Sequence, residues 1–361
     1  MNFSSIWLRS FRVLLFPFAL VYGLIIIIRN YLYDKNIIRA VEFNFPVLCV
    51  GNLSVGGTGK SPMVEYLLRL LTYQFQVATL SRGYKRKTRG YVLANDQTTA
   101  IDIGDEPMQF HIKFPEVAVA VGEERSVVIP QLLYDCDDID VIILDDAFQH
   151  RAIKPGFNIL LTDYNNLFTR DFFLPSGDLR DARSSYKRAD IIIITKCAQD
   201  LPLQEKKSLT AEIDLLPHQQ LFFTGIHYGA PYHIISHAIK HLNRNSEVLL
   251  VCGIANPEPL NNYLQHTTKT YEAIYFNDHH IFRIDDLNEI RRRFDRIKAS
   301  DKIIITTEKD AVRLIKFAGH LKDIPIYVLP IETNFLFNEA ARFNDLIVTF
   351  IKDFANKNQS N

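Results

Sequence analysis

One glycine-rich stretch constrains the fold of this chain more than any other feature. Residues 51–62 read Gly-Asn-Leu-Ser-Val-Gly-Gly-Thr-Gly-Lys-Ser-Pro; the apolar run Phe45–Val50 precedes them, and Met63–Leu71, with apolar residues at helical spacing, follows. A strand, a glycine-rich turn, Gly-Lys-Ser and a helix together form the context that a phosphate-binding loop requires. The stretch therefore predicts a nucleoside triphosphate site rather than a structural turn that contains a lysine by chance.

The residue types of this loop suit phosphate binding. Glycines let backbone N–H groups close around phosphate oxygens, and the start of the helix adds the positive end of its dipole. Lys60 is expected to reach the outer phosphates of ATP, and the Ser61 hydroxyl is expected to bind Mg²⁺. The leading glycine of the usual pattern is replaced by a serine. The predicted ATP-binding residues are Ser54, Val55, Gly56, Gly57, Thr58, Gly59, Lys60 and Ser61.

A second signal is an apolar strand that ends in acid. Residues 139–144 are mainly apolar, and Asp145 and Asp146 follow directly. A carboxylate at the end of a strand downstream of a phosphate loop orients Mg²⁺, directly or through water. An ordinary strand-end aspartate is the alternative reading. The metal role is favoured because these acids lie downstream of the phosphate loop in the chain. Which of the two carboxylates lies nearer the ion is left open.

Two adjacent carboxylates, Asp105 and Glu106, precede a helical stretch. Acids at this position also serve as helix caps, so the pair is a weak signal alone. Glu106 is included with Ser61, Asp145 and Asp146 among the expected Mg²⁺ ligands.

A basic cluster follows the strand Phe75–Leu80 and contains Arg82, Lys85 and Arg86. At the carboxyl end of a sheet strand it faces the ligand edge of a doubly wound fold. It could hold a substrate phosphate or anionic headgroups, or it could be a solvated turn.

Two further segments carry polar groups. The run Asp278-His279-His280 is compatible with a hydrogen-bonded turn, or with a histidine brought across a domain cleft to tune a catalytic base. Thr195-Lys196 ends another buried strand and is expected to lie in a loop near the nucleotide. The acid that guanine-specific proteins place two residues after the lysine is replaced by Ala198.

Composition and element order give the fold class. Lysine plus arginine equals aspartate plus glutamate at 41 each, so no overall field attracts nucleic acid, and no nucleic-acid partner is expected. The four cysteines form no Cys-x-x-Cys pair, which favours reduced thiols in a cytoplasmic compartment. Alternating strands and helices predict an α/β, P-loop NTPase-like fold with a mainly parallel sheet and helices on both faces. We expect a kinase domain at 36–225 and a smaller C-terminal α/β domain at 226–361 that closes over the nucleotide cleft.

Residues 1–35 form a separate N-terminal segment, because residues 13–28 are almost wholly apolar. The run is somewhat shorter than the roughly 20 residues that span a bilayer, and Pro17 and Gly23 interrupt it. A helix embedded in one membrane face is favoured over a true span, and both are favoured over a buried core helix. We therefore expect a membrane-associated N-terminal helix.

Taken together, these motifs resemble the tetraacyldisaccharide 4′-kinases, the lipid A 4′-kinases of Gram-negative bacteria. The resemblance covers nearly the whole chain in family order. Three positions depart from the family pattern, namely Ser61, Ala147 and Asp178, and the last affects a loop shape rather than the chemistry. The motifs that carry the resemblance are residues 51–62, Ser81–Tyr84, Gly104–Pro107, Asp145–His150, Thr195–Cys197, Gly253–Pro257, Asp278–His280 and Thr306–Asp310.

The resemblance implies transfer of the γ-phosphate of ATP to the 4′-hydroxyl of an acylated glucosamine disaccharide 1-phosphate. It also implies a membrane-associated enzyme at the cytoplasmic face of the inner membrane. Carried over from the family, Asp105 is the catalytic base and His279 is its partner, while Lys60 neutralises charge on the transferred phosphoryl group. Placing His279 on the second domain would make catalysis depend on domain closure.

Two other functions remain open from the residues alone. A membrane-bound P-loop ATPase that controls assembly would have the same phosphate loop and acidic strand. A soluble small-molecule kinase would pack its N-terminal helix on its own core.

Overall fold

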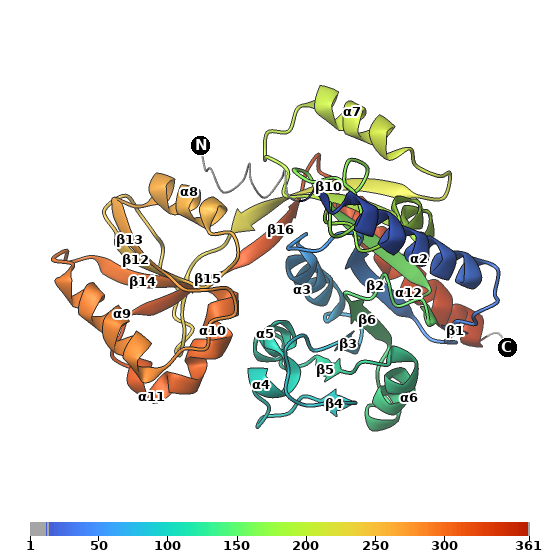
Figure 1. Ribbon diagram of the computed structural model, residues 1–361. Helices are drawn as coiled ribbons and strands as arrows, with labels where there is room; N and C mark the ends of the chain where they lie inside the picture. Colours follow the sequence, from blue (N-terminus) through green and yellow to red (C-terminus); the bar gives the residue numbers. More distant parts are fainter. Residues whose placement is uncertain (1–11, 13, 360–361) are drawn as a thin grey trace.

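The computed structural model describes residue 12 and residues 14–359, and a nine-stranded sheet lies at its centre (Figure 1). The strand order is β16-β10-β9-β8-β2-β6-β3-β5-β4. Neighbouring strands are parallel except for the edge pairs β16–β10 and β5–β4. The strands are β2 (Val47–Asn52), β3 (Val77–Ser81), β4 (Val92–Leu93), β5 (Ala118–Val121), β6 (Val141–Asp145), β8 (Phe157–Asp163), β9 (Ile191–Thr195), β10 (Gln220–Tyr228) and β16 (Ile331–Phe335).

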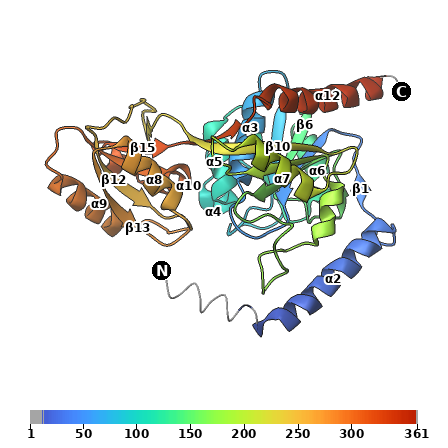
Figure 2. The ribbon, with the colours of Figure 1, turned by 90° about the horizontal axis from the view of Figure 1, so that it is seen from above.

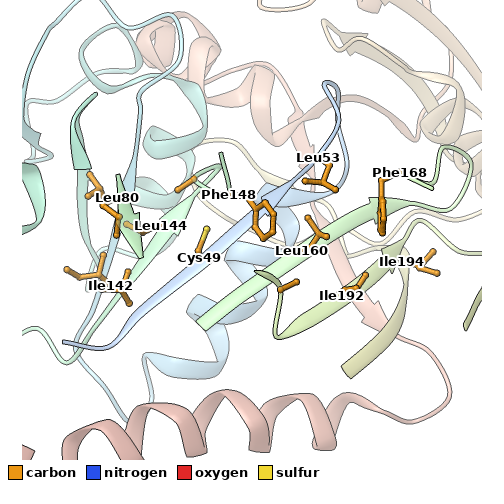
Figure 3. Close-up of a cluster of buried hydrophobic side chains, with 14 of the residues drawn as sticks. Cys49, Leu53, Leu80, Ile142, Leu144, Phe148, Leu160, Phe168, Ile192 and Ile194 are labelled. Atoms are coloured by element: carbon orange, nitrogen blue, oxygen red, sulfur yellow. The ribbon is translucent and has the colours of Figure 1, made fainter. Parts of the chain in front are cut away.

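Helices cover both faces of this sheet because its inner strands are apolar on both sides. One core cluster contains Leu68 of α3 (Lys60–Leu71), Phe110 of α5 (Asp105–Lys113) and Phe343 of α12 (Ala340–Gln359). The cluster on the opposite face includes side chains of α6 (Arg125–Asp135) and α7 (Leu203–Ile213), and Figure 3 shows part of it, from Ile142 to Ile194. The predicted α/β fold is therefore confirmed. Shorter elements are α4 (Ala100–Ile103), η1 (Arg183–Arg188) and the parallel pair β1 (Val41–Glu42) and β7 (Ile153–Lys154).

A second, smaller α/β unit follows β10 and has its own five-stranded sheet in the order β11-β15-β14-β12-β13. Its two separate core clusters lie on the two faces of that sheet. Its strands are β11 (Tyr232–His233), β12 (Glu247–Cys252), β13 (Thr270–Tyr275), β14 (Lys302–Thr307) and β15 (Ile326–Leu329), and its helices are α8 (Glu258–Thr267), α9 (Ile284–Arg296), α10 (Glu308–Leu314), η2 (Ile315–Phe317) and α11 (Ala318–Leu321).

The end of the chain differs from the expected division at 226–361. Strand β16 returns to the large sheet and pairs antiparallel with β10, so these two strands connect the units (Figure 1). Helix α12 then packs Phe343, Ile347 and Ile351 into the core of the large unit. The last part of the expected C-terminal domain thus belongs to the large unit, because the edge of β10 and an apolar sheet face are available to it there.

The N-terminal apolar run forms α2 (Phe16–Asp34), which lies along the edge of the large unit (Figure 2). Residues 1–11 and 13 of the expected N-terminal segment lie outside the described residues. One side of α2 contacts the protein: a Cβ atom on Gly23 would lie 2.6 Å from the Phe173 ring, and Asn30 is buried. The other side exposes large apolar side chains, including Leu20, Leu24 and Ile28. By length and composition alone the helix is apolar enough to cross a membrane.

Candidate active site

The glycine-rich turn links β2 to α3 at the carboxyl edge of the large sheet. Gly56 and Gly59 have φ angles of 101° and 83°, a backbone conformation that L side chains rarely adopt. The space where side chains of Gly56 and Gly57 would lie is open. Lys60 begins α3, so the unpaired N–H groups of the first helical turn point back into the space that the loop encloses. This geometry is a cradle that can accept phosphate oxygens.

Neighbouring strands hold the loop in place through Thr58. The Asn52 side-chain amide donates to Thr58 Oγ1 at 2.7 Å, and Thr195 Oγ1 donates to the Thr58 carbonyl at 2.9 Å. The predicted Thr195-Lys196 segment therefore lies beside the phosphate loop. Lys196 itself pairs with Asp163 at 2.6 Å.

The two acids after β6 have different surroundings. Asp145 is 6% exposed, and its Oδ1 has no hydrogen-bond partner among the described residues. Burial, followed by the charge of Asp146, raises the pKa of Asp145 to about 7. Glu106 is close enough to contribute to this rise, so the start of α5 lies near the end of β6.

Asp146 is instead tied to positive groups. Lys60 Nζ lies 3.7 Å from its Oδ1, and Arg180 NH1 donates to its Oδ2 at 3.1 Å. Burial by itself would raise the pKa of Asp146, but the hydrogen bond from Arg180 and the charge of Lys60 outweigh it and lower the pKa. Arg180 also donates to the Asn52 side-chain carbonyl, which links the acid to the strand before the loop.

The second cluster joins the two units of the protein. Asp105 begins α5 in the large unit and is 6% exposed, whereas His279 lies in the loop before α9 of the small unit. His279 Nδ1 lies 2.8 Å from Asp105 Oδ2. Arg313 of α10 donates its Nε to Asp105 Oδ1 at 2.7 Å and a second N–H to Oδ2. A carboxylate of one unit is therefore bound by a histidine and an arginine of the other.

Lys309, on the same face of α10 as Arg313, contacts the other ring nitrogen of His279. Its ammonium lies 3.1 Å from Nε2, while Arg313 NH2 lies 3.0 Å from Nδ1. Lys309 also pairs with Asp278 at 3.1 Å and lies 3.8 Å from Glu106.

Comparison with known proteins identifies the family. A model of the tetraacyldisaccharide-1-P 4′-kinase family matches residues 11–352. Tetraacyldisaccharide 4′-kinase of Bacteroides thetaiotaomicron is 44% identical over 354 residues, with 94% of this chain and 93% of the relative covered. The Flavobacterium johnsoniae protein of the same name is 46% identical, with 95% and 98% covered. The chain belongs to the tetraacyldisaccharide 4′-kinase family. It is a phosphotransferase of lipid A biosynthesis.

A solved structure of this kinase family has the same fold. It is LpxK of Aquifex aeolicus in complex with ATP, with 26% sequence identity and a TM-score of 0.74 over 94% of this chain and 99% of that one. At this coverage the likeness extends over both units.

The kinase fold also brings together residues that sequence reasoning did not select. Arg180 contacts Asp146, and Lys309 and Arg313 contact the Asp105–His279 pair. Lys309 falls within a family motif, and Arg313 follows it by one helical turn. Helical spacing could therefore have indicated that both side chains lie on one face of the helix. Arg180 lies in a loop, where spacing predicts no neighbour.

Arg86, expected among the basic residues free for substrate, has another role in this kinase. It bonds Glu123 at 2.7 Å and its side chain is 2% exposed, so it holds the loop together. Arg82 and Lys85 are exposed.

The described residues contain no group of three or more His, Cys, Asp or Glu side chains placed to hold a metal. Mg²⁺ in kinases is bound through one or two carboxylates together with substrate phosphates and water, so the unpartnered Asp145 oxygen and the hydroxyl of Ser61 fit that ion.

Proposed function

We propose that this kinase transfers the γ-phosphate of ATP to the 4′-hydroxyl of a tetraacyldisaccharide 1-phosphate at the cytoplasmic face of the inner membrane. The observation that carries the proposal is the 2.8 Å contact between Asp105 of the large unit and His279 of the small unit. A carboxylate held where the two units meet can receive a proton from an acceptor bound between them. Simple ATP hydrolysis does not require that arrangement.

The loop Ser54–Ser61 would bind the phosphates of ATP. Its backbone N–H groups and the start of α3 would bind the phosphates, and Lys60 would neutralise charge on the transferred group. Asp145 and Ser61 would hold Mg²⁺, which supplies further charge neutralisation when bound. Asp145 is favoured over Asp146 as the nearer carboxylate, because Lys60 and Arg180 already occupy Asp146. Glu106 pairs with Lys309 and is a weaker candidate.

Asp105 would act as the general base. Its Oδ2 already accepts from His279 and Arg313, whereas Oδ1 accepts one hydrogen bond, from Arg313. The free lone pair of Oδ1 can therefore receive the sugar hydroxyl, because a carboxylate oxygen accepts two hydrogen bonds. His279 and Arg313 orient the carboxylate for this proton transfer.

Helix α2 supports a membrane-surface location. Its protein-facing side is held by hydrogen bonds from Tyr22 to the Arg180 carbonyl at 3.0 Å and from Asn30 to Asp181 at 2.7 Å. A helix bound along its side to a polar domain cannot also cross the bilayer, so its exposed apolar side is expected to enter one membrane face. Arg82 and Lys85 remain candidates for contact with the acceptor 1-phosphate or with anionic headgroups.

The direct test is transfer of label from γ-labelled ATP to disaccharide 1-phosphate in mixed micelles with Mg²⁺. We expect a labelled lipid that requires the acceptor and the metal. Label released only as inorganic phosphate would favour an ATPase instead. Recovery of the enzyme wholly in the soluble fraction after detergent-free lysis would contradict the membrane location.

A further inference from the structure

Helices α5 and α10 pack side by side across the two units in opposite directions, with an ion pair at each end. Asp105 at the start of α5 bonds Arg313 near the end of α10. Lys113 at the end of α5 bonds Glu308 at the start of α10. The first pair belongs to the candidate active site, and the second lies at the opposite end of both helices.

Lys113 also reaches the helix of the phosphate loop. Its Nζ lies 2.5 Å from Glu65 Oε2 on α3, and Gln109 donates to Glu65 Oε1 at 2.6 Å. Glu65 is 1% exposed and Glu308 is 8% exposed. Glu65 also pairs with Arg69 at 3.2 Å, whereas Lys113 is the one ion-pair partner of Glu308 among the described residues, so Glu308 depends on Lys113 for charge compensation. One ammonium group thus joins three helices, which carry Lys60, Asp105 and Arg313.

Glu308 extends this junction to the connection between the units. Its Oε2 accepts a hydrogen bond at 3.1 Å from the backbone N–H of Ile331, the first residue of β16. Strand β16 is one of the two strands that join the small unit to the large sheet. The junction therefore also contacts the segment about which the two units would move.

Apolar packing between these helices is interrupted beside the junction. A cavity of about 380 Å³ lies beside the junction, and Ile112 of α5, Val312 of α10 and Tyr232 of β11 are among its lining residues. Since side chains here border a hollow space, fewer apolar contacts resist sliding of one helix along the other. The ion pairs at the two ends therefore contribute to the register of the two helices.

We propose that Lys113 is a positioning residue for phosphate transfer: by binding Glu65 and Glu308 together it sets the placement of Arg313 and His279 on Asp105. The inference rests on the proposed role of Asp105 as base. Loss of the ammonium leaves the buried Glu308 without a counter-charge and breaks its link to Glu65, so α10 moves away from α3 and α5. The chemistry responds because a displacement of about 1 Å at a reacting group costs about a hundredfold in rate.

The test compares turnover and KM of Lys113→Met, Lys113→Arg and Glu308→Gln with the wild type, each corrected for the folded fraction. Lys113→Met is expected to lower kcat by about 10- to 100-fold while KM for ATP changes less than about threefold, since the phosphate loop itself is intact. Lys113→Arg should restore most of the turnover. Glu308→Gln keeps the size of the side chain and should lower kcat by a smaller factor than Lys113→Met. It also tests the junction if the Lys113 variants fail to fold. Lys154→Met removes an exposed lysine with a surface ion pair and should change nothing.

A double-mutant cycle separates positioning from general loss of structure. If Lys113 acts through the base, Lys113→Met should have little further effect on turnover in an Asp105→Ala background. An equal fold-loss in both backgrounds, or wild-type kcat in Lys113→Met and Glu308→Gln, would overturn the inference and leave the proposed function intact. Wild-type turnover of Asp105→Ala alone would overturn both.

Discussion

Substitution of the buried acid at the end of β6 should have opposite effects on activity and on stability. We expect Asp145→Asn to lower phosphate transfer by about a hundredfold or more, because the proposed metal site loses its charge. We expect the same substitution to stabilise the nucleotide-free protein near and above neutral pH. A residue retained for structure alone would not stabilise the protein when removed.

The expected increase in the stability of Asp145→Asn follows from the environment of Asp145. Its carboxyl is 6% exposed, Oδ1 has no partner among the described residues, and burial followed by Asp146 raises its pKa from 3.8 to about 7. At about 1.4 kcal/mol per pKa unit, keeping the charged form buried costs about 4 kcal/mol. The asparagine amide avoids this cost but leaves its own polar atoms unpaired at about 1–3 kcal/mol. The net gain above pH 7 is therefore about 1–3 kcal/mol.

The direction of the pKa shift of Asp145 fixes how stability changes with pH. Folding raises the pKa of Asp145, so the stability associated with its protonated form is fully present below about pH 4 and is lost as pH rises through about 7. The free energy of unfolding of the wild type should therefore fall relative to that of Asp145→Asn by about 2–3 kcal/mol between about pH 5 and pH 8.

Urea denaturation followed by circular dichroism, without nucleotide or metal, measures this difference. The control is Asp138→Asn, which removes an exposed carboxylate from the same segment and should show no such pH dependence. A variant destabilised by one constant amount at every pH would refute the reasoning, because it would mean that Asp145 makes a favourable contact rather than carrying an uncompensated buried charge.

Three further outcomes follow from the structure. Asp105→Ala should lower turnover by about a hundredfold or more with ATP affinity nearly unchanged, and steady-state kinetics with equal turnover would contradict the base assignment. Leu24→Asp, on the exposed side of α2, should weaken co-sedimentation with vesicles about tenfold or more, whereas Ile101→Asp, exposed on α4, should not. Gly51→Ala should destabilise the fold by about 1–3 kcal/mol, because its Cβ would lie 2.6 Å from the neighbouring phenylalanine Cβ; Gly57→Ala meets open space, and an equal thermal shift in both would contradict this.

Local patterns were sufficient for the parts of the molecule that depend on neighbouring residues. The phosphate loop, α3 and the acid-ended strand β6 follow from glycine placement, helical spacing and an apolar run that ends in aspartate. Chain order added the sheet, because successive parallel strands bring their carboxyl ends to one edge. The family motifs then linked Asp105 with His279, although 174 residues separate them in the chain.

Only the folded chain decided which side chains meet when sequence spacing carries no signal. Arg313 binds Asp105 across 208 residues, and β16 returns to β10 because an unpaired strand edge is available there. The unequal surroundings of Asp145 and Asp146 likewise depend on where Arg180 and Lys60 come to lie, since alternate side chains around one turn face different environments. Helix and strand periodicities are properties of a few consecutive residues, whereas burial and charge pairing are properties of the packed whole.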